Sequence, residues 1–219
     1  MPMREGFLTK LSELKEEIML LGSMVEKSFV NVVTGIEKNN QLIFDDVIEN
    51  DHHVNSLELD INEKATLLIA KQQPVASDLR KIIVALKISS DLERVGDLAV
   101  DMAKAANRIN GSKQLETYHS DLIMMANKTQ KMLRDVLRAY QSENVIDAQY
   151  IANVDDEIDE AYGAFVQSIF KIKSKDEETT ELITQLVFIA RYIERIADYS
   201  TNIAEWIIYE VNGERFDLN

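Results

Sequence analysis

Apolar residues recur at spacings of three and four along most of this chain, a pattern typical of long amphipathic α-helices that each bury one stripe. The first such helix is expected from about Phe7 to Glu37, with the stripe Leu11, Leu14, Ile18, Leu21, Val25, Phe29, Val32 and Ile36. The same period predicts five more helices, over about Gln41–Gln72, Asp78–Asn110, Glu116–Gln141, Asn144–Lys173 and Asp176–Val211.

Helix boundaries are marked by a small number of residues. Pro74 ends the second predicted helix, since the residue before a proline disfavours helical geometry. Ser77 and Asp78 are suited to capping the third helix, and Gly111 is suited to ending it. The acidic run 176–178 suits the positive N-terminus of the last helix. Because glycine and proline are scarce, a β-rich fold is not expected.

The third and sixth predicted helices are copies of one another. Residues 91–106, DLERVGDLAVDMAKAA, align with residues 192–207, YIERIADYSTNIAEWI, at an offset of 101. The second and fifth helices match less strictly, with residues 51–55 corresponding to residues 155–159 at an offset of 104. A difference in loop length explains the change of offset. The chain is therefore expected to contain an internal repeat.

The repeat predicts an all-α fold of two tandem, similar units, residues 1–112 and 113–219. Each unit is expected to be a bundle of three antiparallel helices, because the predicted connections are short. Helices of this length would extend roughly 45 Å at 1.5 Å per residue. No low-complexity linker separates the units, so the two bundles are expected to pack together.

Acidic residues at four-residue spacing lie in the copied helices. Each step of four advances roughly 40° around a helix, so such residues share one flank. The third helix carries Glu93, Asp97 and Asp101, and the sixth carries Glu194, Asp198 and Asn202. The preceding helices add Asp51 and Asn55 in the first unit, then Asp155 and Asp159 in the second. If the helices pack side by side, four or more oxygen donors converge in each unit.

Like charges at this spacing repel, and a hard or borderline cation such as Mg²⁺, Mn²⁺, iron or Ca²⁺ would offset that repulsion. Ordinary ion pairs are the alternative. Arg94 and Arg195 each lie three residues before an aspartate of the pattern, and Arg191 lies three residues before Glu194. The appearance of the pattern twice, beside the same apolar stripe, strengthens the metal-binding interpretation, and ordinary ion pairing stays open as the alternative.

Charge and composition exclude several classes of function. The net charge of −14 disfavours binding to nucleic acid. The absence of cysteine removes disulfides, thiol catalysis and cysteine metal sites, and agrees with a reducing cytoplasm. No signal peptide and no apolar run long enough for a transmembrane segment is found. No arrangement of nucleophile and base is recognisable, so no catalytic residue is assigned and an enzyme is not expected.

One enzymatic alternative stays open, a carboxylate-bridged di-iron oxidase in a helical bundle. The pairs Glu49–His52 and Glu116–His119 have the Glu-x-x-His spacing of such sites. They occupy non-equivalent places in the repeat, unlike the carboxylates. A purely structural helical module with solvated acids, and no metal, is a further alternative.

Three segments resemble the PhoU family, whose members regulate bacterial phosphate uptake. They are QQPVASDLR (72–80), DLERVGD (91–97) and IERIADYSTNIAEWIIYEVNGE (193–214). The resemblance covers nearly the whole chain and implies two similar three-helix bundles. It also implies metal ions, iron clusters first, with zinc, manganese and magnesium left open. The implied ligands are Glu93, Asp97, Asp101, Glu194, Asp198, Asn202, Asp155, Asp159 and Asp51.

The family resemblance further implies a regulatory adaptor and negative regulator of the phosphate-starvation response. Its partners would be the ATPase subunit of the phosphate ABC transporter, a sensor histidine kinase and a second copy of the chain. It would be cytoplasmic, held at the inner face of the membrane through those partners. Ala197 and Tyr199 depart from the family pattern, which has glycine and often histidine there, so no ligand role is assigned to position 199.

Overall fold

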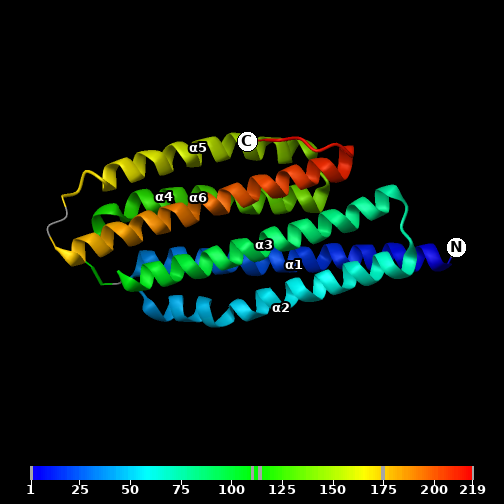
Figure 1. The fold of residues 1–219 in the computed structure, drawn as a ribbon, viewed down its shortest axis with the longest axis horizontal. Helices are drawn as coiled ribbons and strands as arrows, with labels where there is room; N and C mark the ends of the chain where they lie inside the picture. Colours follow the sequence, from blue (N-terminus) through cyan, green and yellow to red (C-terminus); the bar gives the residue numbers. More distant parts are fainter. Residues whose placement is uncertain (1, 110, 113–114, 174–175, 219) are drawn as a thin grey trace.

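The computed structural model describes residues 2–109, 111–112, 115–173 and 176–218, and in these residues it contains helices and no strand (Figure 1). The helices are α1 (Pro2–Lys38), α2 (Gln41–Gln72), α3 (Ala76–Arg108), α4 (Leu115–Ser142), α5 (Val145–Ile169) and α6 (Glu177–Asn212). The all-α prediction and the six predicted helices are confirmed. The predicted ends differ from these bounds by a few residues.

The turns after α1 and after α4 are built alike, which extends the internal repeat to the connections. Asn39 and Glu143 adopt left-handed conformations, with φ of 51° and 54°. The next residues, Asn40 and Asn144, cap α2 and α5, and each side-chain oxygen accepts a hydrogen bond from the backbone N–H two residues later. Both turns therefore reverse the chain within two residues and make the joined helices antiparallel.

The start of α3 corrects one prediction. Ser77 and Asp78 do not cap this helix, since it already begins at Ala76, and the residue before it, Val75, makes no side-chain cap hydrogen bond. Gln73 ends α2 in a left-handed conformation before Pro74, Val75 is extended, and α3 begins at the next residue. Asp78 instead lies in the first turn, where its charge suits the helix N-terminus.

Two helix ends also differ from the sequence prediction. The helix α5 ends at Ile169, four residues before Lys173. The predicted end of the third helix, Asn110, lies outside the described residues, and α3 ends at Arg108. Gly111 has a φ of 82°, so it stops the chain from continuing as a helix, as its residue type predicts.

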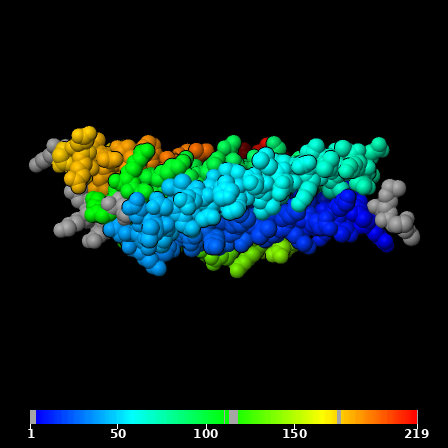
Figure 2. Space-filling view, turned by 90° about the horizontal axis from the view of Figure 1, so that it is seen from below, coloured from blue at the N-terminus to red at the C-terminus, as the bar shows by residue number. Residues whose placement is uncertain are grey.

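The helices form two three-helix units, α1–α3 and α4–α6, that pack against each other lengthwise. One layer contains α2, α3, α6 and α5 in that order, and α1 and α4 lie behind it (Figure 1). The contact between the units is made by α3 with α6 and by α1 with α4. The result is an elongated molecule, along which α2 lies beside α1 (Figure 2). The prediction that the bundles pack together is confirmed.

The helices α3 and α6, which carry the acidic patterns, meet at the centre of this layer and run antiparallel. Near one end of the pair, Arg80 at the start of α3 donates a hydrogen bond of 3.4 Å to the backbone oxygen of Glu210 at the end of α6. Equivalent helices of the two units therefore lie back to back in opposite directions. The acidic flank of α3 faces α2, and the acidic flank of α6 faces α5.

The buried apolar side chains form one continuous core that runs through both units. Aromatic and β-branched residues such as Phe29, Phe44 and Ile82 are almost fully removed from water. Burial on this scale is what holds long helices together, because helix propensity alone contributes little. None of the helices, as far as the structure describes them, has the uncharged apolar length needed to cross a bilayer.

Candidate metal centre

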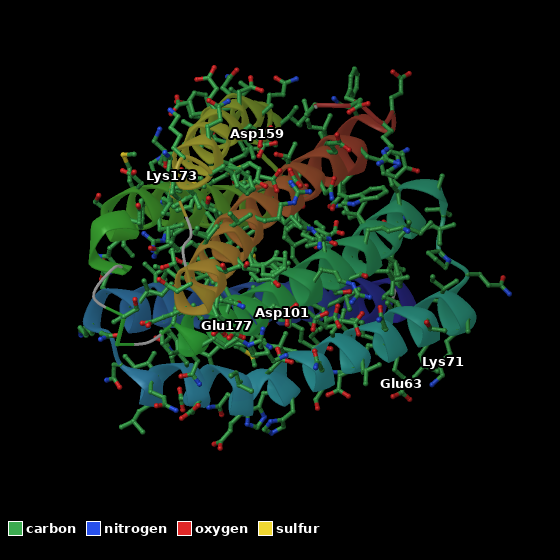
Figure 3. The ribbon with its side chains drawn as sticks, turned by 60° about the vertical axis from the view of Figure 1, so that its left-hand side comes forward. Glu63, Lys71, Asp101, Asp159, Lys173 and Glu177 are labelled. Carbon is green, nitrogen blue, oxygen red and sulfur yellow. The ribbon has the colours of Figure 1, made fainter. Side chains whose placement is uncertain are left out.

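Three carboxylates of the second unit converge between α5 and α6. Asp159 comes from α5 (Figure 3), and Glu194 and Asp198 come from successive turns of α6. Each offers one oxygen atom, and these oxygens all lie within 4.8 Å of one another. The four-residue spacing on α6 places its two acids on the flank that meets α5. The side-by-side packing expected from the sequence therefore brings the acids of neighbouring helices together.

Glu194 of this cluster and the neighbouring Asp155 are buried and have oxygen atoms without partners, while Asp159 is exposed. Asp155 is 4% exposed and Glu194 is 7% exposed. Within the described residues, Asp155 Oδ1, Glu194 Oε2 and Thr201 Oγ1 have no hydrogen bond of normal geometry, although the Thr201 hydroxyl lies near enough to Asp155 to lower the pKa of that acid. An unsatisfied buried acceptor is unfavourable by about 1–3 kcal/mol, and more when it is charged. These oxygens therefore leave room for a ligand that the protein chain does not supply.

The pKa values of these acids also support the binding of a cation. Burial, followed by the charge of Asp198, raises the pKa of Glu194 to about 7. Burial also raises the pKa of Asp155 to about 6, and the nearby Thr201 hydroxyl opposes this rise in part. Burial raises the pKa of Asp198 as well. A cation bound among these oxygens would reverse the shifts, since it favours the ionised carboxylates. The donor set, all hard oxygen, fits iron, manganese or magnesium.

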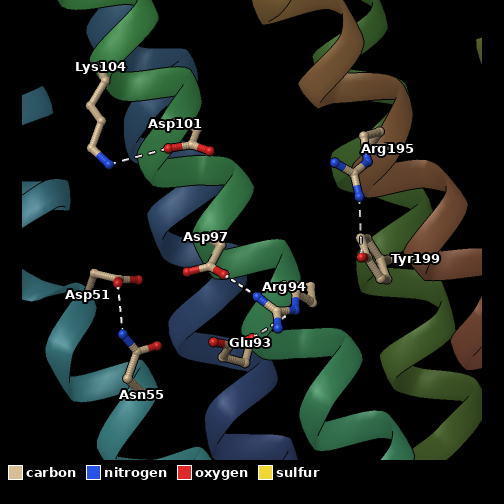
Figure 4. A network of polar contacts seen from close by, with 9 residues as sticks. All are labelled: Asp51, Asn55, Glu93, Arg94, Asp97, Asp101, Lys104, Arg195 and Tyr199. Carbon is tan, nitrogen blue, oxygen red and sulfur yellow. Dashed lines mark hydrogen bonds and ion pairs between the residues drawn. The ribbon is translucent and has the colours of Figure 1, made fainter.

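The corresponding residues of the first unit form a polar network among their own side chains, in which Asn55 Oδ1 alone of the described atoms is buried without a hydrogen-bond partner (Figure 4). Asn55 donates to Asp51 Oδ2 at 3.0 Å, which joins two successive turns of α2. On α3, the Arg94 guanidinium lies 3.5 Å from Glu93 Oε2 and 2.9 Å from Asp97 Oδ2. Here one arginine joins two acids, whereas in the second unit Arg191 pairs with Glu194 alone.

The acids of the first unit nevertheless influence one another across α2 and α3. Burial, with a contribution from the charge of Asp97, raises the pKa of Asp51, while the hydrogen bond from Asn55 opposes that rise. Burial and then Asp97 raise the pKa of Glu93. The two helices therefore bring the predicted residues near each other, although the acids are less buried than Asp155 and Glu194.

Two of the predicted ligands lie elsewhere on their helices. Asp101 is half-exposed and pairs with Lys104 at 3.3 Å. Asn202 lines a cavity of about 520 Å³ together with Asp91 and Trp206, between α2, α3 and α6. Their roles as ligands stay predictions.

The sequence reasoning missed Thr201, whose hydroxyl lies beside Asp155. The available signal was that Thr201 is polar at a position where the aligned residue of the first unit, Val100, is apolar. Thr201 is itself fully buried. A polar residue placed on the buried side of an otherwise matching helix indicates a polar neighbour.

The two histidines considered for a di-iron site do not face a common cavity. His52 lies on α2 and His119 on α4, and these two helices do not pack against each other. The His52 Nδ1 atom lies 2.7 Å from the backbone oxygen of Glu49 on its own helix. The pairing of Glu-x-x-His motifs required for a di-iron oxidase is therefore not formed.

The whole chain is similar to proteins of known family. A family model described as the PhoU domain matches twice, over residues 18–106 and 122–207. A protein of Clostridium acetobutylicum named phosphate-specific transport system accessory protein PhoU homolog is 38% identical, and the match covers 99% of each chain. The phosphate-specific transport system accessory protein PhoU of Escherichia coli K12 is 33% identical, over 96% of this chain and 87% of that protein.

Solved structures agree with the sequence matches. The crystal structure of the phosphate transport system regulatory protein PhoU from Streptococcus pneumoniae superimposes with a TM-score of 0.89 at 31% identity, covering 96% of this chain and 99% of that one. PhoU from Pseudomonas aeruginosa superimposes with a TM-score of 0.88 at 28% identity, covering 95% and 100%. Since the family model matches both three-helix units and the relatives align over nearly their full length, the chain belongs to the PhoU family.

Proposed function

We propose that this chain is a regulatory, metal-binding adaptor of phosphate uptake. The relatives are named as accessory or regulatory proteins of phosphate transport, and the family is not one of enzymes. The role proposed is that of a negative regulator, which keeps the phosphate-starvation response off while phosphate is plentiful. It acts by binding partners and not by chemical conversion of a substrate.

The observation that carries the metal-binding part is the set of buried carboxylate oxygens without partners in the second unit. Asp159, Glu194 and Asp198 would ligate the ion, with Asp155 completing the set. In the first unit, the corresponding ligands would be Asp51, Glu93, Asp97 and Asp101, and Asn202 is proposed as a further oxygen donor of α6. Iron is the first candidate, with manganese, zinc and magnesium as the alternatives.

The adaptor part rests on the family and on the shape of the molecule. Long helices side by side offer extended faces to which another helix or domain can dock. The proposed partners are the ATPase subunit of the phosphate ABC transporter and a sensor histidine kinase, with a second copy of the chain forming a homodimer. The chain would then be cytoplasmic and reach the inner face of the membrane through these partners. Residues 1–112 and 113–219 are proposed as its two domains.

Metal binding is tested on untagged purified protein by elemental analysis after incubation with iron, manganese, zinc and magnesium. Glu194→Ala/Asp198→Ala removes ligands of the second unit, and Glu93→Ala/Asp97→Ala removes the aligned residues of the first. We expect bound metal in the wild type and a loss of about half of it in each double variant, if each unit holds an equal share at saturation. No bound metal in the wild type would contradict the proposal.

A matched control separates this function from the di-iron alternative. The double variant His52→Ala/His119→Ala is expected to keep all its metal, because these side chains lie on helices that do not touch. The regulatory role is tested in the host organism by deleting the gene. Expression of the phosphate-starvation genes at high phosphate is the expected result, and unchanged repression would overturn the adaptor proposal.

A further inference from the structure

Arg94 and Arg195 occupy equivalent positions in the repeat, yet their guanidinium groups make different contacts (Figure 4). Arg94 bridges Glu93 and Asp97, at 3.5 Å and 2.9 Å. Arg195 instead donates a hydrogen bond of 3.4 Å to the Tyr199 hydroxyl, and its guanidinium carbon lies 5.8 Å from the centre of the Tyr199 ring. In the described part of the chain, Arg195 forms no ion pair with a carboxylate, and its charge reaches Asp198 only at longer range, where it lowers the pKa of that acid.

The difference follows from a single aligned position, four residues after each arginine. The second unit has Tyr199 there, and the first unit has Leu98. The aromatic ring and hydroxyl of tyrosine attract a guanidinium from one helical turn away. Leu98 is buried at 5% exposure and offers neither a ring nor a hydrogen-bond acceptor. Arg94 therefore has no comparable partner on its own helix except the carboxylates.

The contact of Arg94 bears on cation binding, because it joins two carboxylates that would ligate the same ion. A metal ion entering the first unit must replace this arginine or share the acids with it, and two nearby positive charges repel. In the second unit, Arg191 contacts Glu194 through Oε1 alone, and Oε2 stays without a partner. Arg191 therefore occupies one oxygen of one acid, whereas Arg94 pairs with two acids of the first unit.

A second difference acts in the same direction. The residue of α2 that aligns with Asp159 is Asn55, so the first unit presents a carboxamide where the second presents a carboxylate. Asn55 uses its amide to hold Asp51 at 3.0 Å. A neutral ligand attracts a divalent or trivalent ion less strongly than a carboxylate does. The two units are thus unequal in both charge and accessibility.

We propose that Tyr199 is a positioning residue that holds Arg195 away from the carboxylates of the second unit, so that this unit takes up a metal ion before the first, where Arg94 competes with the metal. The inference rests on the proposed metal binding and adds an order of filling to it. It also assigns a role to a position at which the chain departs from the family pattern.

The first test replaces Tyr199 of the second unit by leucine, the residue at the aligned position of the first unit. Manganese(II) binding is measured by electron paramagnetic resonance in protein that carries Glu93→Ala/Asp97→Ala, so that the second unit alone reports. We expect Tyr199→Leu to weaken manganese binding by about tenfold, because the freed Arg195 pairs with the acids of α6. Adding Arg195→Gln to Tyr199→Leu is expected to restore the affinity, which a merely structural role of Tyr199 would not allow.

The second test leaves Tyr199 intact and examines the competing arginine. In protein carrying Glu194→Ala/Asp198→Ala, the variant Arg94→Gln is expected to tighten manganese binding in the first unit by about tenfold. The matched variant Arg195→Gln, made in the protein with the second unit intact, is expected to change the affinity by less than about threefold. Circular dichroism of each variant verifies that the helices are retained.

The outcomes separate this inference from the function on which it rests. If manganese binds to the wild type but Tyr199→Leu and Arg94→Gln leave both affinities unchanged, the positioning role is wrong and metal binding stands. If Arg195→Gln does not restore the binding lost in Tyr199→Leu, the proposed mechanism is likewise overturned. A wild type that binds no manganese, iron, zinc or magnesium overturns both proposals.

Discussion

Trp206 of the second unit donates its indole N–H to a carboxylate oxygen of Asp91 in the first unit, over 3.1 Å. The contact crosses the interface between α6 and α3. The Lys87 Nζ atom lies 5.7 Å from a ring centre of the Trp206 indole, and the Arg215 guanidinium carbon lies 4.9 Å from one. Burial raises the pKa of Asp91 to about 6, and the indole donor opposes that rise. A polar contact therefore joins the units within a largely apolar interface.

Replacing Trp206 by Phe should destabilise the protein more at pH 8 than at pH 5. Loss of the donor leaves the Asp91 carboxylate buried without it, at a cost of about 1–3 kcal/mol when the group is ionised. Because the folded-state pKa of Asp91 is raised to about 6, the group is mostly protonated at pH 5 and the penalty is smaller there. Urea unfolding followed by circular dichroism measures both values. Packing losses do not depend on pH, so equal losses at the two pH values would contradict this account.

The contribution of Glu210 to the free energy of unfolding should fall as pH rises. Burial raises its pKa to about 7, although the nearby Lys15 and Lys81 lower it and Glu143 raises it further. For an acid whose folded-state pKa is raised, the stabilising contribution is complete below pH 4.5, the ordinary pKa of a glutamate, and is lost as pH passes 7. Glu210→Gln should therefore be about 2 kcal/mol more stable than the wild type at pH 8 and nearly equal to it at pH 5. A variant less stable than the wild type at pH 8 would show that the lysines dominate.

Metal binding in the second unit should strengthen as the pH rises from 5.5 to 8. Glu194 and Asp155, with pKa values of about 7 and about 6, must lose their protons before they can ligate a cation. Isothermal titration calorimetry with manganese at several pH values measures the effect. If binding releases one proton, the affinity is expected to rise about tenfold for each pH unit. Glu194→Gln should flatten the profile. A pH-independent affinity would mean that the ion binds at other groups.

Gly22 and Gly163 offer a matched pair of substitutions in α1 and α5. A Cβ atom at Gly22 would lie 2.6 Å from Leu137 Cδ2 on α4, across the contact between the two units. Gly22→Ala should therefore cost about 1–3 kcal/mol, since overpacking outweighs the gain in helix propensity. At Gly163 a Cβ meets no atom within 4 Å, so Gly163→Ala should stabilise by about 0.5–1 kcal/mol. Equal effects in denaturant titrations would contradict the packing of α1 on α4.

The sequence was sufficient to predict the helices and their duplication, because both depend on patterns local to the chain. Apolar spacing identified six helices, and the match of residues 91–106 with residues 192–207 identified two units. Spacing on α6 also placed Glu194 and Asp198 on one flank. The approach of Asp159 to them depended on how α5 packs against α6, which could be stated from the sequence only as a condition.

Side-chain conformations were beyond the reach of such patterns. Arg94 and Arg195 lie in the same motif, yet they make different contacts because the residue one turn later differs. Thr201 was overlooked because a buried hydroxyl in a helix resembles any other small residue in a periodicity plot. The burial of Asp91 depends on Trp206, which is more than a hundred residues away in the sequence. These features arise from packing between elements and require a three-dimensional structure.

The antiparallel pairing of α3 with α6 joins two similar units within one chain, and this has an evolutionary consequence. In a homodimer of identical three-helix subunits, any substitution is made twice, once in each subunit, so related sites must change together. In this chain the two halves are joined, and each position can vary alone. Two such independent changes are Asn55 in the first half where the second half has Asp159, and Leu98 where the second half has Tyr199. The covalent link between the halves thus allows two sites of common descent to acquire different thresholds within a single folded molecule.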